Sequence, residues 1–312
     1  MAKKLISIVT GCCNEVENLP ELYERILAVM AKFPAYDWEL LVADNHSTDG
    51  TRELLRRMAA ADKRVKVVLN ARNFGHIRSP MNLFRQAYGN AVITMCSDLQ
   101  DPPELISEMI RKWEQGTKVV IAVRDRTECN FLMEGGRRLY YALLRKASLE
   151  AEVVSGFTGY GLYDRQFVDA FRLFRDPYPY FRGMIAEIGF ERAEIPFVQP
   201  RRKRGKTKNN WLTLYDMAMT GFVNHSKLPL RLATITGFVV GALSLVAAMV
   251  YLVLKLCFWD TFQLGLAPLV IGMFFLSAVQ LFFIGVIGEY LGAVWTQVKD
   301  RPLAIEEERI NF

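Results

Sequence analysis

The amino-acid sequence predicts an α/β protein, with a doubly wound and mainly parallel sheet followed by a two-helix transmembrane hairpin. Three observations predict it. Short apolar runs alternate with helical patterns over the first 125 residues. Acidic and polar loops follow several of these runs, where a doubly wound sheet binds its ligands. Two long apolar stretches lie near the C-terminus and are each long enough to cross a bilayer.

The predicted strands are nearly continuous apolar runs, which is typical of parallel strands covered on both faces. They are Leu5–Thr10, Glu39–Ala43, Val65–Leu69, Ala91–Met95 and Val119–Val123. Helical patterns separate the strands. They cover Asn18–Lys32, Thr51–Ala61, Pro80–Tyr88 and Pro103–Glu114. This alternation predicts a sheet with helices packed on both sides.

Three loops are expected at the carboxyl ends of the strands, namely Gly11–Glu17, Asp44–Gly50 and Cys96–Asp101. Carboxylates at such an edge can hold a hard divalent cation together with substrate phosphates. Helix capping is the alternative for Asp49 and Asp101, because both precede predicted helices. Capping does not explain Asp98, which lies earlier in its loop.

The C-terminal third of the chain predicts a membrane anchor. Leu232–Leu254 and Leu266–Leu291 are joined by a short link and are therefore expected to form a hairpin. Basic residues precede the first apolar stretch, at Lys227 and Arg231, and follow the second, at Lys299 and Arg301. This bias predicts an integral protein of the plasma or inner membrane, with both termini and the α/β domain in the cytoplasm.

We therefore expect four segments. Residues 1–208 form the cytoplasmic α/β domain, and residues 209–231 form a juxtamembrane amphipathic helix. Residues 232–298 form the hairpin, and residues 299–312 form a cytoplasmic tail. Small-residue patterns in both apolar stretches, at 237/241 and 288/292, favour helix pairing and a homo-oligomer.

The net charge of +6 indicates acidic partners. A basic run at residues 201–208 could be a solvated face, a nucleic-acid contact, or a contact with substrate phosphates and lipid headgroups. The run adjoins an amphipathic stretch and the hairpin, so we expect membrane lipid and no nucleic acid. The five cysteines show no metal-binding spacing, which indicates reduced thiols.

Several motifs occur in an order that resembles a known family. They are Asn14-Glu15-Val16-Glu17-Asn18, Asp44-Asn45 with Ser47-Thr48-Asp49-Gly50-Thr51, Asn73-Phe74-Gly75, and Asp98-Leu99-Gln100-Asp101-Pro102-Pro103-Glu104. Together they resemble family 2 glycosyltransferases, and in particular the polyprenyl-phosphate sugar transferases related to dolichyl-phosphate mannose synthase and bacterial polyprenyl-phosphate glucosyltransferases. The resemblance covers nearly the whole chain, including the hairpin.

This resemblance implies a GT-A fold, a nucleotide-sugar donor, a polyprenyl phosphate acceptor and inverting transfer at the cytoplasmic membrane face. It also implies a divalent cation, Mg²⁺ or Mn²⁺, at the donor diphosphate. Asp44 matches the residue that contacts the nucleotide base, with Thr10, Glu15 and Asn45 nearby. Asp98 and Gln100 match metal ligands. Basic positions match phosphate contacts, with Arg124 and Arg138 for the lipid and Arg204, Lys206 and Lys208 for the donor.

The chain departs from the family pattern at several positions, including His76, which stands where a lysine often follows the Asn-Phe-Gly motif. Cys96 replaces the first aspartate of the Asp-x-Asp motif, Asn45 replaces a second acidic residue, and His46 replaces a usual glycine. A thiol is a poor ligand for Mg²⁺, which prefers oxygen. Two alternatives therefore stay open: a transferase that acts on another membrane lipid, and a non-catalytic relative that binds a nucleotide-sugar or lipid as a partner subunit.

Overall fold

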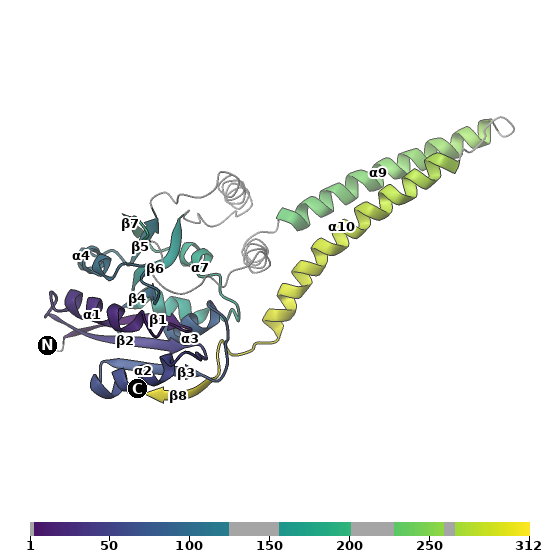
Figure 1. The fold of residues 1–312 in the computed structure, drawn as a ribbon. Helices are drawn as coiled ribbons and strands as arrows, with labels where there is room; N and C mark the ends of the chain where they lie inside the picture. The colour runs from purple at the N-terminus through teal and green to yellow at the C-terminus, as the bar shows by residue number, and fades with distance from the viewer. Residues whose placement is uncertain (1–2, 125–155, 201–227, 259–265) are drawn as a thin grey trace.

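The computed structural model describes residues 3–124, 156–200, 228–258 and 266–312, which form a mixed sheet with flanking helices and a long helical hairpin (Figure 1). The described strands are β1 (Lys4–Cys12), β2 (Tyr36–Asp44), β3 (Val65–Asn70), β4 (Ala91–Cys96), β5 (Val119–Arg124), β6 (Phe157–Asp164), β7 (Arg192–Phe197) and β8 (Glu306–Ile310). Their spatial order is β7-β5-β6-β4-β1-β2-β3-β8.

The five strands predicted from apolar runs are confirmed as β1 to β5. Strands β1, β2, β3 and β4 pair in parallel, with β1 between β2 and β4. Two strands run against this direction. Strand β6 lies antiparallel between β4 and β5, and β8 pairs antiparallel with the outer side of β3. The carboxyl ends of β1, β2 and β4 therefore meet at one edge of the sheet.

Helices cover both faces of the sheet, as a doubly wound fold requires. In the described domain they are α1 (Leu19–Met30), α2 (Thr51–Ala61), α3 (Arg78–Gln86), the 3₁₀ turn η1 (Pro103–Leu105), α4 (Ile106–Glu114), α6 (Arg165–Leu173) and α7 (Phe181–Ile188). Neighbouring strand residues face opposite layers. Ile8 packs with α1, α2 and α4, whereas Val9 packs with α3, α6 and α7.

The residue pair Asp164-Arg165 has a structural role in this protein. The Asp164 carboxylate accepts a hydrogen bond from Trp113 Nε1 at 2.8 Å. The Arg165 guanidinium donates to the carbonyls of Ala87 and Gly89. The pair therefore joins β6 and α6 to the segment before β4, away from the carboxyl-end loops.

The predicted hairpin consists of α9 (Leu228–Cys257) and α10 (Leu266–Val298), which project from the sheet (Figure 1). Spans of 28 and 27 residues, Leu230–Cys257 and Gly272–Val298, are long and apolar enough to cross a membrane. Their most apolar stretches are not buried inside the protein. Residues 209–227 of the predicted juxtamembrane helix lie outside the described residues, and residues 228–231 begin α9.

The segment after the hairpin returns to the sheet, which the sequence did not indicate. The predicted tail, residues 299–312, contributes β8, with Val67 opposite Ile310 and Leu69 opposite Glu308. Asn311 Nδ2 extends this contact by donating to the carbonyls of Ala59 and Val65. The chain therefore leaves the sheet domain, forms the hairpin and comes back to complete the sheet.

Candidate active site

Three loops at the carboxyl edge of the sheet each contain a non-glycine residue with a left-handed backbone. Asn14 follows β1 with φ 61°, His46 follows β2 with φ 62°, and Leu99 follows β4 with φ 62°. Residues other than glycine rarely adopt this backbone conformation, and those that do cluster at functional sites. The observation marks the same edge that the sequence predicts to bind ligand.

Hydrogen bonds join the first two of these loops. The N–H of Asn14 donates to Ser47 Oγ at 2.8 Å, and the N–H of Thr48 donates to Asn14 Oδ1 at 2.8 Å. The N–H of Glu15 donates to Thr51 Oγ1 at 3.0 Å. The loops after β1 and β2 are therefore positioned as one unit.

The capping alternative holds only in part, because the N-cap of α2 is Gly50 and Asp49 lies one residue before it. Asp49 Oδ1 accepts from the N–H of Thr51 at 3.0 Å, so this carboxylate covers the start of α2. Asp101 does not cap the helix that follows it. Its Oδ2 accepts from the N–H of Cys96 at 2.8 Å, whereas its buried Oδ1 has no hydrogen-bond partner. Burial raises the pKa of Asp101 to about 6.

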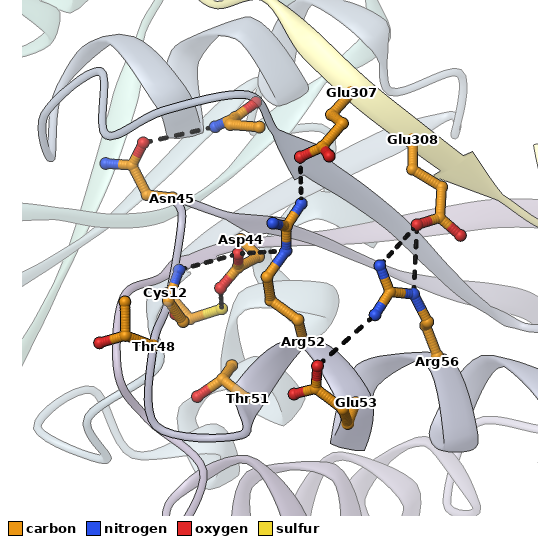
Figure 2. Close-up of polar contacts among 12 residues, drawn as sticks. Cys12, Asp44, Asn45, Thr48, Thr51, Arg52, Glu53, Arg56, Glu307 and Glu308 are labelled. Atoms are coloured by element: carbon orange, nitrogen blue, oxygen red, sulfur yellow. Dashed lines mark hydrogen bonds and ion pairs between the residues drawn. The ribbon is translucent and has the colours of Figure 1, made fainter.

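Asp44, the predicted base contact, is fully buried at the end of β2 (Figure 2). Its Oδ2 accepts from the N–H of Ser47 at 3.1 Å and lies 3.6 Å from Arg52 Nε. Its Oδ1 accepts from Cys12 Sγ at 3.9 Å. Burial, and then the negative charge of Asp44, raise the pKa of the Cys12 thiol well above its ordinary value. The buried Asp44 therefore stabilises the loop that follows β2 through its hydrogen bond with Ser47.

The other predicted donor contacts near Asp44 are Thr10, Glu15 and Asn45, and all three are buried. Asn45 joins β2 to the Asn73-Phe74-Gly75 motif, because its Oδ1 accepts from the N–H of Phe74 and its Nδ2 donates to Asn73 Oδ1, both at 2.8 Å. Glu15 accepts from Asn18 Nδ2 at 2.5 Å. The structure thus brings these residues together. Asn45 and Glu15 help to fix the loops, whereas the buried Thr10 Oγ1 has no hydrogen-bond partner.

Among the predicted site residues at this edge, those that are not buried lie on the loop after β4. Cys96 is exposed, and Asp98 and Gln100 are half-buried. Asp98 Oδ1 accepts from the N–H of Gln100 at 3.1 Å. The carboxylate of Asp101 raises the pKa of the Cys96 thiol well above its ordinary value, so this thiol stays protonated. Asp98 and Gln100 therefore offer the oxygen ligands of the loop.

Within the described residues, no group of three or more His, Cys, Asp and Glu side chains is arranged to hold a metal ion. One carboxylate and one amide oxygen still suit Mg²⁺ or Mn²⁺, because such cations keep several waters and take further oxygen ligands from substrate phosphates. The half-buried Asp98 and Gln100 have the oxygen ligands for a cation bound in this way.

The predicted phosphate contacts are described only in part. Arg124 ends β5, and its Nη1 donates to Gln199 Oε1 at 2.7 Å. The other four, Arg138, Arg204, Lys206 and Lys208, lie outside the described residues.

Sequence reasoning missed Arg52, which lies one residue after the Asp49-Gly50-Thr51 motif. Its side chain is only 16% exposed, and it extends between Asp44 and Glu307 of β8 (Figure 2). No local pattern could reveal it, because Glu307 lies 255 residues further along the chain.

Comparisons with known proteins agree with the fold and the motifs. Residues 7–171 match the family described as glycosyl transferase family 2. An uncharacterized glycosyltransferase, YkcC of Bacillus subtilis, is 33% identical over 97% of this chain and 93% of its own length. A prophage-derived bactoprenol glucosyl transferase of Shigella flexneri is 30% identical over 95% of this chain and 96% of its own.

A solved mannosyltransferase from Pyrobaculum calidifontis, in complex with GDP-Man and Mn²⁺, aligns with 96% of this chain and 89% of its own, at 16% identity and a TM-score of 0.49. The family match spans more than half of the chain, and the two curated relatives match 97% and 95% of it. The chain therefore belongs to glycosyl transferase family 2, and its sheet is the GT-A domain of a glycosyltransferase.

Proposed function

We propose that this protein transfers a sugar from a nucleotide-sugar to a polyprenyl phosphate at the cytoplasmic face of the membrane, with inversion at the anomeric carbon. The similarity to a bactoprenol glucosyl transferase supports this acceptor class, because it extends over 95% of the chain and includes the hairpin.

The short connection between the hairpin and the sheet is the observation that carries the proposal. Helix α10 ends at Val298 and β8 begins at Glu306, so residues 299–305 form the whole link. Seven residues span at most about 25 Å. The GT-A domain is therefore tethered close to the end of an apolar helix, where a soluble donor can meet a lipid-borne acceptor.

The chemistry of this acceptor makes a general base unnecessary. A phosphate monoester has a second pKa near 6 and is mostly dianionic at neutral pH. A phosphate oxygen attacks the anomeric carbon, and the bond from that carbon to the donor diphosphate breaks, with its electron pair leaving on the nucleoside diphosphate. The protein then has to position the anionic acceptor and stabilise the leaving diphosphate.

We assign these tasks to the residues of the carboxyl edge. Asp98 and Gln100 would hold the divalent cation, which neutralises diphosphate charge when bound. Asp44, with Thr10, Glu15 and Asn45, would shape the surface for the base. Positive side chains would neutralise phosphates, with Arg124 and Arg138 for the acceptor and Arg204, Lys206 and Lys208 for the donor.

A donor screen tests the proposal. Membranes that contain the full-length protein and polyprenyl phosphate are incubated with labelled nucleotide-sugars, and the lipids are extracted. We expect one labelled lipid that mild acid cleaves, and its loss in Asp98→Ala. A labelled lipid that resists mild acid would instead indicate another acceptor, such as a glycerolipid.

Cys96 favours a second candidate function, that of a non-catalytic partner subunit. A protonated thiol stands where the family pattern has a carboxylate. This candidate predicts that the purified protein binds a nucleotide-sugar but transfers nothing from any donor. Turnover in the donor screen would exclude it.

A further inference from the structure

The C-terminal strand contacts the donor edge of the sheet through one arginine. Arg52 Nη2 donates to Glu307 Oε2 of β8 at 2.6 Å, while Nε of the same guanidinium lies 3.6 Å from Asp44 Oδ2 (Figure 2). Asp44 is fully buried, whereas the Glu307 side chain is 54% exposed. Arg52 therefore joins a surface residue of the last strand to a buried carboxylate at the end of β2.

The neighbouring arginine on α2 provides an internal comparison. Arg56 Nη2 donates to Glu308 Oε2 at 2.8 Å, and Arg56 Nη1 lies 3.7 Å from Glu53. Both arginines therefore tie β8 to α2 through a glutamate. Among the described residues, Arg56 forms ion pairs with Glu53 and Glu308, whereas Arg52 also reaches Asp44.

Arg52 approaches Asp44 at one of its two carboxylate oxygens, namely Oδ2. Asp44 Oδ2 already accepts from the N–H of Ser47, and it is also the atom nearest to Arg52 Nε. That Nε is buried and has no hydrogen-bond partner. Glu307 accepts from Nη2 of the same guanidinium, and the charge of Arg52 supports Asp44 without a hydrogen bond to it.

Loss of Glu307 would remove this restraint. The nearest remaining carboxylate for Arg52 is Asp44, and a charge pair in a largely buried region attracts more strongly than one in water. The guanidinium would close onto Asp44 Oδ2 and compete with the N–H of Ser47. Ser47 Oγ also accepts from the N–H of Asn14, so the change would reach the loop after β1.

We propose that Arg52 is a positioning residue of the donor site and that Glu307 sets its position, so that docking of β8 controls affinity for the nucleotide. This inference rests on the proposed function, in which the Asp44 loop contacts the donor base. It assigns the segment after the membrane hairpin a part in donor binding.

The test compares Glu307→Gln with Glu308→Gln in the full-length protein. Each variant removes one ion pair between β8 and α2, but only Glu307→Gln changes the environment of Asp44. The probes are UDP, GDP, CDP and dTDP, each titrated calorimetrically with Mn²⁺. We expect Glu307→Gln to lower the affinity for the nucleotide that the wild type binds by about fivefold. This change is within the range of coupling free energies measured between sites in proteins. Glu308→Gln should stay within about twofold.

Two further readouts separate positioning from general loosening of the tail. Glu307→Asp keeps the charge and should restore most of the affinity. In the transfer assay, Glu307→Gln should raise the KM for the donor and leave kcat nearly unchanged. Equal effects of Glu307→Gln and Glu308→Gln, or no effect of either, would overturn the inference and leave the proposed function intact. A wild type that binds none of the four nucleotides would overturn both.

Discussion

The N–H of Cys96 donates to Asp101 Oδ2 at 2.8 Å and closes the loop that carries Asp98 and Gln100. The contact spans five residues, so it holds both ends of the loop at the carboxyl end of β4. Leu99, at the centre, takes the left-handed backbone that this tight loop requires. The loop is therefore fixed before any ligand binds, as preorganised electrostatic catalysis needs.

Asp98→Asn should lower kcat/KM for sugar transfer by about 100-fold or more. The variant keeps the size of the side chain but removes the negative charge that we propose to bind the cation. Stabilisation of a leaving group by a metal ion is worth several kcal/mol. Glu104→Gln is the matched control, because Glu104 lies on the same segment but pairs with Arg25. Equal activity of the two variants would show that Asp98 holds no essential cation.

Cys96→Asp should strengthen Mg²⁺-dependent nucleotide binding, because it adds a hard oxygen ligand beside Asp98. We expect the affinity for Mg²⁺ to rise by at least about tenfold. Mutation of residues that only support the metal ligands already changes metal affinity by about this factor. Cys96→Ser, which adds a neutral oxygen, should gain much less. Titration with Mg²⁺ at a fixed nucleotide concentration measures the Mg²⁺ affinity of both variants. An unchanged affinity in Cys96→Asp would show that the cation does not bind beside residue 96.

His46→Gly should raise the thermal midpoint of unfolding above that of His46→Ala. Both variants remove the imidazole, but only glycine adopts φ 62° without steric strain. A left-handed backbone costs other residues roughly 1–2 kcal/mol, so we expect a difference of about 1 kcal/mol between the two. Scanning calorimetry checks it. Equal midpoints would mean that the loop relaxes to another conformation in the alanine variant.

Asp62→Asn should lower stability at neutral pH and lose this effect in acid. Hydrogen bonds from Arg64, and one from Tyr23, lower the pKa of Asp62 to about 2 from an ordinary value of 3.8. The stabilisation is therefore complete above pH 4 and disappears as pH falls towards 2. Arg64 is half exposed, so we expect only about 1 kcal/mol.

Denaturant midpoints of wild type and Asp62→Asn, measured at pH 6 and again near pH 2, test the sign. The two proteins should differ at pH 6 and converge in acid. A difference that persists at low pH would assign the effect to lost packing rather than to the charge of Asp62.

Strands β1 to β5 could be predicted because their apolar runs carry the signal of burial on both faces. The signal fails for β6, where glycines at 159 and 161 interrupt the pattern. At Gly161 a Cβ atom would lie 2.6 Å from the carbonyl oxygen of Val120, so glycine is required by the neighbouring strand. That requirement arises from tertiary contact and cannot be read locally.

Strand β8 is still harder to predict from the local sequence than β6. Its sequence, Glu-Glu-Glu-Arg-Ile, has little intrinsic preference for a strand. It forms because β3 offers an open edge and α2 and α3 supply partners for the glutamates, such as Arg52, Arg56 and Gln86. These partners are more than 200 residues away in sequence.

The candidate site was partly predictable for a related reason. Acidic residues at strand ends identified the loops of Asp44 and Asp98, since topology alone brings such ends together. Which of these side chains are buried depends on packing, and Asp44 and Asn45 proved to lie beneath the surface. The phosphate-binding roles of Arg124 and of the basic positions beyond it stay predictions.

The pairing of β8 with β3 makes the hairpin an insertion within the globular fold rather than an appendage to it. During synthesis the ribosome must finish both apolar helices before the outermost strand emerges, so β3 keeps a bare edge until both helices have been made. Completion of the sheet is thereby linked to synthesis of the whole hairpin. A polypeptide truncated ahead of the helices would never cover that edge, and we expect it to self-associate.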